Sequence, residues 1–172
     1  MKQIFQNRFL RSMQFSNSRE ELAFLNQVPV ERVLSIDLDD GQNPICYIGY
    51  DSLTQDIEFV LSFRSESNEE DLNLIFWQDR IVFDTGRSVF FVSYELELKA
   101  SLELTTPLIG FHLVSDNELL ILEEAFMRVV NKNGLVLKSE SFDLVTRTTF
   151  EKNRLVLQTE SGQRTLYLDP PA

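Results

Sequence analysis

Cys46 and His112 are the single cysteine and the single histidine of the chain, and these residue types often serve as nucleophile and general base. Cys46 lies in the apolar run 44–48, where a free thiol usually packs as a small hydrophobe. Zinc would need further Cys or His ligands, and the sequence has no glycine-rich phosphate loop. We therefore predict no catalytic residue, no metal ligand and no cofactor.

Asp37, Asp39 and Asp40 precede Gly41 in a string whose composition resembles that of a calcium-binding loop. An EF-hand loop requires glycine at its sixth position and a bidentate glutamate at its twelfth. Counted from Asp37, the glycine is fifth and the twelfth residue is Ile48. The pattern fails, and a hairpin turn is predicted here instead.

Acidic residues are numerous and unevenly distributed. The net charge is −11, and residues 31–71 contain 11 acidic residues against Arg32 and Arg64. Such a field repels phosphate, which disfavours nucleic acid and anionic membranes as partners, and it attracts a basic protein. The residues predicted to form this partner-binding acidic surface are Asp37, Asp39, Asp40, Glu66, Glu69, Glu70 and Asp71.

The first 28 residues carry the opposite charge, with four basic residues against Glu20 and Glu21. Ser18 and Glu21 have the spacing of a capping box, and Pro29 ends the segment, so we predict a short helix at about 19–27. Residues 1–28 are expected to form an N-terminal arm through which a homo-oligomer could assemble. The segment has no apolar secretory core, and the default expectation is a cytoplasmic protein.

The positioning elements are predicted to be strands. Residues 95–104 alternate apolar and polar side chains over their whole length, which is the pattern of a strand with one buried and one wet face. The same alternation recurs at 56–63, where Ile57, Phe59, Leu61 and Phe63 are expected to share one face. One wet face favours antiparallel pairing.

Turn residues separate about twelve such segments. The clearest hairpin signal is Asn131-Lys132-Asn133-Gly134, because Asn and Gly tolerate the positive φ of tight turns. Further turns are predicted at 84–86, 116–117 and 160–162.

From about residue 89 onward the chain resembles β-propeller blade repeats of the quinoprotein or WD40 kind. The resemblance lies in the segments 118–122, 126–130 and 135–139, and again in 153–158 with 161–163. The Trp-Asp and Gly-His pairs of WD40 blades and the tryptophan docking motif of quinoproteins are lacking. The resemblance implies a blade-type sheet stack and no activity.

These patterns together predict one all-β domain spanning residues 1–172, with one short N-terminal helix. The favoured fold is an antiparallel β-sandwich or open barrel built of meanders and hairpins. The alternative is a partial propeller-like stack of blade-type sheets.

The sequence leaves three hypotheses about function open. The favoured hypothesis is a non-enzymatic protein-binding module, for example an immunity-like inhibitor of a basic partner. A second hypothesis is a β-barrel that binds a small apolar ligand, because the chain has 14 Phe residues. A third is a carboxylate-dependent hydrolase, with or without His112 as a base.

Overall fold

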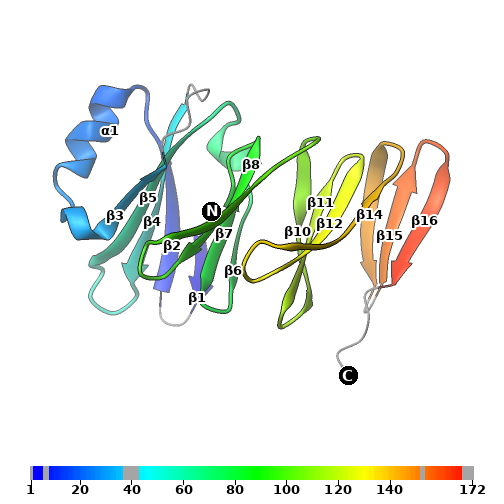
Figure 1. Ribbon diagram of the computed structural model, residues 1–172. Helices are drawn as coiled ribbons and strands as arrows, with labels where there is room; N and C mark the ends of the chain where they lie inside the picture. The colour runs from blue at the N-terminus through cyan, green and yellow to red at the C-terminus, as the bar shows by residue number, and fades with distance from the viewer. Residues whose placement is uncertain (1, 6–7, 37–42, 152–153, 168–172) are drawn as a thin grey trace.

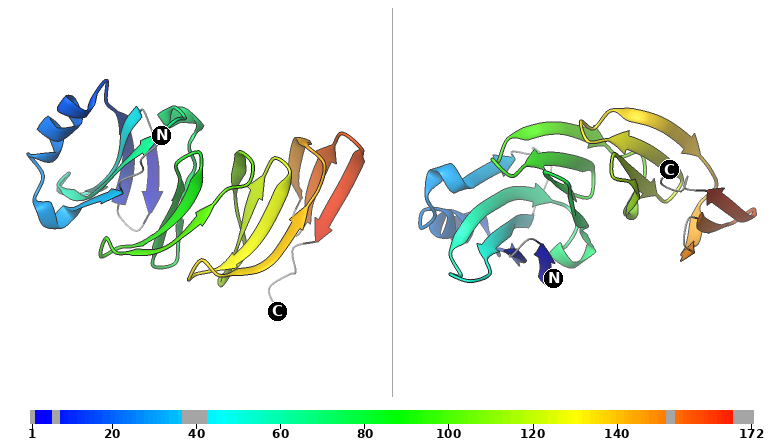
Figure 2. Two further views of the ribbon diagram at one scale, coloured as in Figure 1. Left: turned by 45° about the horizontal axis from the view of Figure 1, so that its top comes forward. Right: turned by 90° about the horizontal axis from the view of Figure 1, so that it is seen from below.

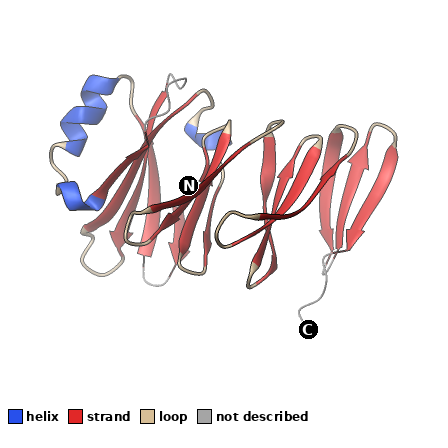
Figure 3. Ribbon diagram, viewed as in Figure 1, coloured by secondary structure: helices blue, strands red, loops and turns tan. Residues whose placement is uncertain are grey.

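The computed structural model describes residues 2–5, 8–36, 43–151 and 154–167, and strands form most of it (Figures 1 and 3). The elements in chain order are β1 (Lys2–Phe5), β2 (Arg8–Gln14), α1 (Ser18–Leu25), η1 (Val30–Arg32), β3 (Val33–Ile36), β4 (Asn43–Asp51), β5 (Ile57–Ser65), η2 (Glu69–Asp71), β6 (Leu74–Trp77), β7 (Arg80–Asp84), β8 (Ser88–Ser93), β9 (Leu98–Glu103), β10 (Leu108–Ser115), β11 (Glu118–Glu123), β12 (Phe126–Asn131), β13 (Val136–Ser141), β14 (Val145–Glu151), β15 (Arg154–Thr159) and β16 (Gly162–Tyr167).

The strands form four separate sheets. Sheet 1 has the order β1-β2-β4-β5-β3, sheet 2 is β6-β7-β8-β9, sheet 3 is β10-β11-β12-β13 and sheet 4 is β14-β15-β16. Pairing is antiparallel throughout except between β3 and β5, which are parallel. The sheets follow one another along a curved path, which is clearest from below (Figure 2).

Three apolar cores lie between neighbouring sheets, and a fourth lies under α1. The core between sheets 1 and 2 is aromatic: the ring centroids of Phe63 and Phe83 are 5.0 Å apart, and those of Phe83 and Phe90 are 5.7 Å apart. Phenylalanine therefore fills an inter-sheet core here, and aromatic pairing adds to the area buried.

The all-β prediction with one short helix is confirmed. The favoured sandwich or open barrel does not form, because the described strands divide into four small sheets stacked in series. The observed arrangement is the predicted alternative, a partial propeller-like stack.

Ser18 is the first residue of helix α1, so the residue that caps the helix is Asn17 and not the predicted Ser18. The Asn17 side chain accepts hydrogen bonds from the amides of Arg19 and Glu20, at 3.0 and 3.1 Å. Glu21, which the capping-box prediction assigned to the helix start, points into the protein instead. Its carboxylate accepts from the Ser62 hydroxyl at 2.6 Å and pairs with Arg64 at 3.1 Å. The acid therefore fastens α1 to sheet 1.

Residues 1–28 contain both strand and helix. Strand β2 pairs with β4 over seven residues, from Arg8↔Asp51 to Gln14↔Ile45, and Leu10 is buried in the core between sheets 1 and 2. The described part of the predicted arm thus consists of two strands of sheet 1, β1 and β2, and the helix α1.

The strand predicted at 95–104 is shorter in the structure, and its side chains exchange faces partway along it. Phe91 pairs with Ala100 and Val92 pairs with Leu98, so Lys99 is an extra residue in a β-bulge. Leu96 lies in the turn before β9 with a φ of 62°. The bulge places Leu98 on the face opposite to Ala100, and Leu98 is 48 % exposed.

The hairpin predicted at 131–134 is confirmed. The Asn131 side chain accepts from the amides of Asn133 and Leu135 at 2.9 and 3.1 Å, and Gly134 has a φ of +74°. A Cβ on Gly134 would lie 2.6 Å from the Ala100 Cβ. Glycine therefore lets this turn of sheet 3 approach sheet 2.

Candidate ligand pocket

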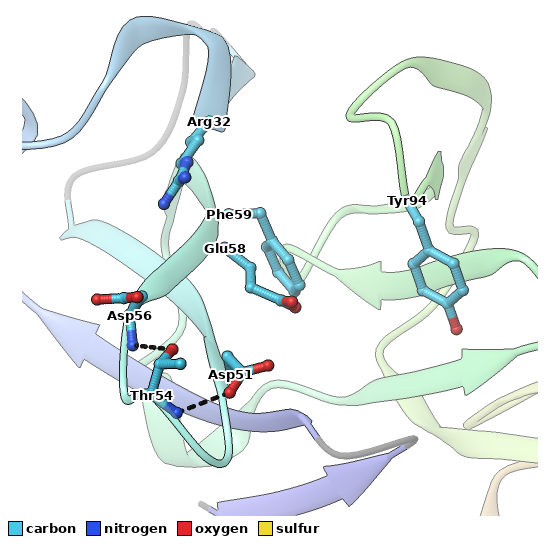
Figure 4. A pocket seen from close by; sticks show the side chains of 7 residues that line it. All are labelled: Arg32, Asp51, Thr54, Asp56, Glu58, Phe59 and Tyr94. Carbon is cyan, nitrogen blue, oxygen red and sulfur yellow. Dashed lines mark hydrogen bonds between the residues drawn. The ribbon is translucent and has the colours of Figure 1, made fainter.

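An open pocket lies where the β4–β5 hairpin of sheet 1 faces the β8–β9 turn of sheet 2 (Figure 4). Its volume is about 410 Å³. We call it the acidic pocket, and its lining residues are Arg32, Asp51, Thr54, Asp56, Glu58, Phe59 and Tyr94.

The hairpin that forms one wall is closed by Asp51. Its Oδ1 accepts hydrogen bonds from the amides of Leu53 and Thr54, both at 2.8 Å, as aspartate does at the start of many turns. The Asp56 amide then donates to the Thr54 hydroxyl at 3.3 Å. These bonds hold the turn so that its carboxylates stay at the mouth of the pocket.

Glu58 enters the pocket because of a β-bulge. Gly49 pairs with Phe59 while Tyr50 pairs with Ile57, which leaves Glu58 as the extra residue of β5. A bulge re-aims the side chain next to it. Ile57 consequently packs under α1, whereas Phe59 packs between sheets 1 and 2. Figure 4 shows the Glu58 carboxylate beside the Phe59 ring, on the side that faces Tyr94.

The Phe59 ring lies directly over Gly49 on the neighbouring strand. A Cβ built on Gly49 would be only 2.2 Å from Phe59 Cε1, a distance at which something must move. Phe59 is 4 % exposed, so its ring has little room to retreat. Glycine at position 49 thus sets the wall of the pocket.

Arg32 is the one cation among the lining residues. It is the last residue of the short helix η1, and its Nη1 donates to the Ile57 carbonyl. Three carboxylates therefore face one guanidinium around this cavity, and the local field is negative.

Tyr94 forms the opposite wall from the β8–β9 turn. Its hydroxyl donates to the Gln78 carbonyl at 3.1 Å. Gln78 and Leu96 both have left-handed backbones, with φ of 54° and 62°, which costs a non-glycine residue about 1 kcal/mol each. The Tyr94 hydroxyl thus bonds from one turn with a left-handed residue to a second such turn. Backbone strain of this kind is common beside binding sites.

The chemistry of this lining suits binding of a cation or a multiple hydrogen-bond donor. Carboxylates accept hydrogen bonds and attract positive charge, and the partly exposed Tyr94 ring offers an apolar edge to an aliphatic stem. Among the residues that the structure describes, no group of three His, Cys, Asp or Glu side chains is placed to hold a metal ion.

The predicted acidic surface is only partly visible, because Asp37, Asp39 and Asp40 lie outside the described residues. Glu66 forms an ion pair with Arg87, with a nitrogen–oxygen distance of 2.6 Å. Glu69 accepts from the Ser12 hydroxyl. The carboxylates of these two residues are therefore engaged in contacts within the protein.

Glu70 and Asp71 are exposed on η2, between β5 and β6. The acidic pocket is at the other end of β5, where this nine-residue strand begins. At about 3.3 Å per residue, the two ends of β5 are roughly 30 Å apart. The acids of the pocket and those of η2 thus lie at two separate places on the described part of the chain.

Asp51, Asp56 and Glu58 were counted in the acidic excess of residues 31–71 but were not singled out as site residues. The excess of acidic residues in 31–71 was the sequence signal that pointed toward these three residues. The bulge at Glu58 and the approach of Tyr94 from another sheet leave no mark in the local sequence pattern.

His112 and Cys46 are not among the residues that line the acidic pocket. His112 is half-buried in β10, and burial lowers its pKa. Cys46 is fully buried in β4, where burial raises the pKa of its thiol to about 12. The thiol is therefore protonated at neutral pH and poorly nucleophilic.

No helix among the described residues has the length and apolarity that a membrane crossing requires. The sequence matches no protein family and no characterised protein.

Two of the solved structures with similar folds have TM-scores above 0.5 and come from different proteins. The structure of BamB from Moraxella catarrhalis is 16 % identical, with a TM-score of 0.53 over 74 % of this chain and 40 % of that one. A structure of BBS1N in complex with ARL6DN is also 16 % identical, with a TM-score of 0.54 over 78 % of this chain and 46 % of that one. The chain spans less than half the length of either. The likeness is one of fold, and it places the four stacked sheets among β-propeller-like architectures.

Proposed function

We propose that this protein is an interaction module that binds a basic partner protein, with the acidic pocket receiving a lysine or arginine side chain. The observation that carries this proposal is the lining of the cavity, in which Asp51, Asp56 and Glu58 face a single arginine. A cavity of about 410 Å³ has room for one long basic side chain.

The shape of the pocket supports the same class of partner. Lysine and arginine pack their methylene stems on apolar surface and keep the charged head in a polar environment. The partly exposed Tyr94 ring offers the apolar surface, and Glu58 lies beside Phe59 (Figure 4). The wider negative charge of the chain would also speed encounter with a basic protein.

The fold is compatible with this role. The BBS1N structure contains a second protein, ARL6DN, so one structure of similar fold is known in a protein complex. Identity of 16 % carries over no partner, and the identity of the basic protein, including an immunity-like role, remains part of the proposal.

The two alternative hypotheses have less support from the geometry. The form of the hydrolase hypothesis that uses His112 as a base lacks support, because His112 is not in the pocket lining. A barrel interior for a small apolar ligand is not formed by the described strands, which are arranged as a stack of open sheets.

The proposal is tested by nuclear magnetic resonance with the peptide acetyl-Gly-Lys-Gly-amide as probe and acetyl-Gly-Glu-Gly-amide as its control. The lysine peptide should shift the backbone amides of residues 54–59 and of Tyr94, with a dissociation constant on the order of 1 mM. The glutamate peptide should leave them unchanged.

A pair of variants separates the pocket from general acidity. The double substitution Asp56→Asn with Glu58→Gln should abolish the shifts. The double substitution Glu70→Gln with Asp71→Asn removes the same charge at the other end of β5 and should preserve them. If both variants weaken binding equally, the peptide senses only the overall charge and the pocket is not a site.

A further inference from the structure

Sheet 4 has one strand fewer than its neighbours. Sheets 2 and 3 each contain four strands that follow one another along the chain, whereas sheet 4 contains three among the described residues. By order, β16 corresponds to β8 and β12, and each of those pairs with a fourth strand, β9 or β13. On its far side, β16 has no strand partner in the part of the chain that the structure describes (Figure 1).

The free edge of β16 presents backbone donors at known positions. Thr159 and Gly162 flank a two-residue loop, so they form a hydrogen-bonded pair, and such pairs alternate along an antiparallel ladder. Arg164 and Leu166 therefore bond to β15. The backbone N–H groups of Gln163, Thr165 and Tyr167 point outward, where a further strand could pair with them.

A groove with both apolar and polar lining residues runs along the same end of β16. Its volume is about 560 Å³, and its wall on sheet 4 is formed by β16 alone. We call it the β16 groove, and its lining residues are Val114, Glu118, Leu120, Met127, Val129, Leu137, Lys138, Thr165, Leu166 and Tyr167.

The groove continues the core between sheets 3 and 4. Leu120 and Met127 are fully buried members of that core and also line the groove. At its mouth, Leu137 is 49 % exposed and Tyr167 is 78 % exposed. Large apolar side chains beside an open strand edge are a liability in a free protein unless another chain covers them.

We propose that β16 and the β16 groove bind an extended segment of another protein, which adds to sheet 4 as a fourth strand. This site is separate from the acidic pocket, and the proposal goes beyond the function proposed above. Main-chain hydrogen bonds to β16 would supply affinity, and side chains inserted in the groove would supply specificity.

The fourth strand of sheet 2 indicates what the segment must contain. Ala100 and Leu102, two residues apart on β9, both pack against the core between sheets 2 and 3. A strand beside β16 would likewise need apolar side chains at alternate positions to continue the core between sheets 3 and 4. Its other positions would face outward with Gln163 and Thr165 and would be polar.

The probe is a synthetic peptide with the sequence of residues 98–104, Leu-Lys-Ala-Ser-Leu-Glu-Leu, which alternates in this way around Ala and Leu. Added in excess to the full-length protein, it should slow hydrogen exchange of the Gln163, Thr165 and Tyr167 amides by about tenfold or more. It should also shift the resonances of Leu137 and Leu166.

Two variants at one position provide the control. Thr165→Pro removes an outward N–H without removing a bond to β15, and it should abolish peptide binding. Thr165→Val keeps the N–H and should bind the peptide much more tightly than Thr165→Pro does. Thermal unfolding checks that both variants fold.

Three results would overturn the proposal. The first is equal peptide binding by both folded variants, or no binding by the unaltered protein. The second is protection of the three amides in the isolated monomer, which would mean that the chain covers its own edge. The third is a dimer that Thr165→Pro converts to a monomer, which would make a second copy the occupant.

Discussion

Gly49 gives the most direct test of the pocket wall at the scale of single residues. Gly49→Ala should destabilise the protein by about 1–3 kcal/mol, because a Cβ 2.2 Å from the Phe59 ring forces a buried side chain to move. Urea unfolding measures this loss. The double variant Gly49→Ala with Phe59→Leu should lose less than the sum of the two single changes, because the smaller side chain relieves the clash.

Gly110→Ala is the matched control, because Gly110 also lies in a strand and its nearest neighbour to a new Cβ is His112 Nε2 at 3.8 Å. That change should be close to neutral. Equal losses from both alanines would mean that glycine at position 49 has no steric role.

Asp84 predicts a pH dependence. Its Oδ2 accepts from the Asn73 amide at 2.6 Å and its Oδ1 from the Gly86 amide at 2.9 Å. Burial raises the pKa of this carboxyl, and the amide hydrogen bonds offset part of the rise. A folded-state pKa above the unfolded value of about 3.9 means that the folded protein holds the proton more tightly. The contribution of Asp84 to stability is therefore largest at low pH and declines as the pH rises through the folded value.

The measurement compares the unfolding free energy of the protein with that of Asp84→Asn between about pH 4 and pH 7. The difference, unaltered protein minus variant, should fall as the pH rises. A difference that rises with pH would mean that the two amide hydrogen bonds outweigh burial.

At the scale of elements, the docking of α1 depends on a buried acid. Glu21 is 6 % exposed and contacts Ser62 and Arg64 on β5. Glu21→Gln should cost about 1–3 kcal/mol, because it leaves the Arg64 guanidinium without its charged partner. Hydrogen exchange of the α1 amides should also accelerate.

Glu20→Gln is the control on the same helix, since Glu20 is exposed and accepts from the Ser16 amide at the protein surface. It should change stability by less than about 0.5 kcal/mol. If the two glutamines behave alike, the contacts of Glu21 do not hold the helix.

Alternation of apolar and polar residues predicted which segments are strands. It did not predict which side chains of a strand share one face. The pattern at 56–63 placed Ile57 and Phe59 on one face, and the bulge at Glu58 separates them into different cores. The pattern at 95–104 failed in the same way at Lys99. A bulge depends on how the neighbouring strand pairs, so the sequence of one strand does not contain it.

The turns were predicted more reliably, because their chemistry is local. Asn131 and Gly134 form their hairpin through contacts within five residues. The pocket brings together Arg32, Asp51 and Tyr94 from separate elements, and only the charge excess of residues 31–71 pointed toward it.

At the scale of the whole molecule, the stack has covered or polar outer faces. Helix α1 packs on the outer face of sheet 1, where its residues Phe24 and Leu25 lie against a cluster that includes Ile48 and Val60. The opposite face of sheet 4 carries the exposed residues Arg147, Arg154 and Gln158. Polar terminal faces are what a stack of repeated units needs in water.

The stack should be measurably less compact than a sandwich of the same size. Its accessible surface is 9674 Å², against about 8,700 Å² for a compact monomer of this mass. Small-angle scattering of the monomer should give a radius of gyration above the roughly 16 Å expected for a compact domain of this length. A value at or below that figure would contradict the open stack.

The most direct test of the proposed function is a crystal structure of the protein soaked with acetyl-Gly-Lys-Gly-amide. We expect the lysine side chain to lie between the β4–β5 hairpin and Tyr94, with its ammonium about 2.7–3.2 Å from the carboxylate of Asp56 or Glu58. A lysine bound at Glu70 and Asp71 instead, or no peptide in the acidic pocket at saturating concentration, would contradict it.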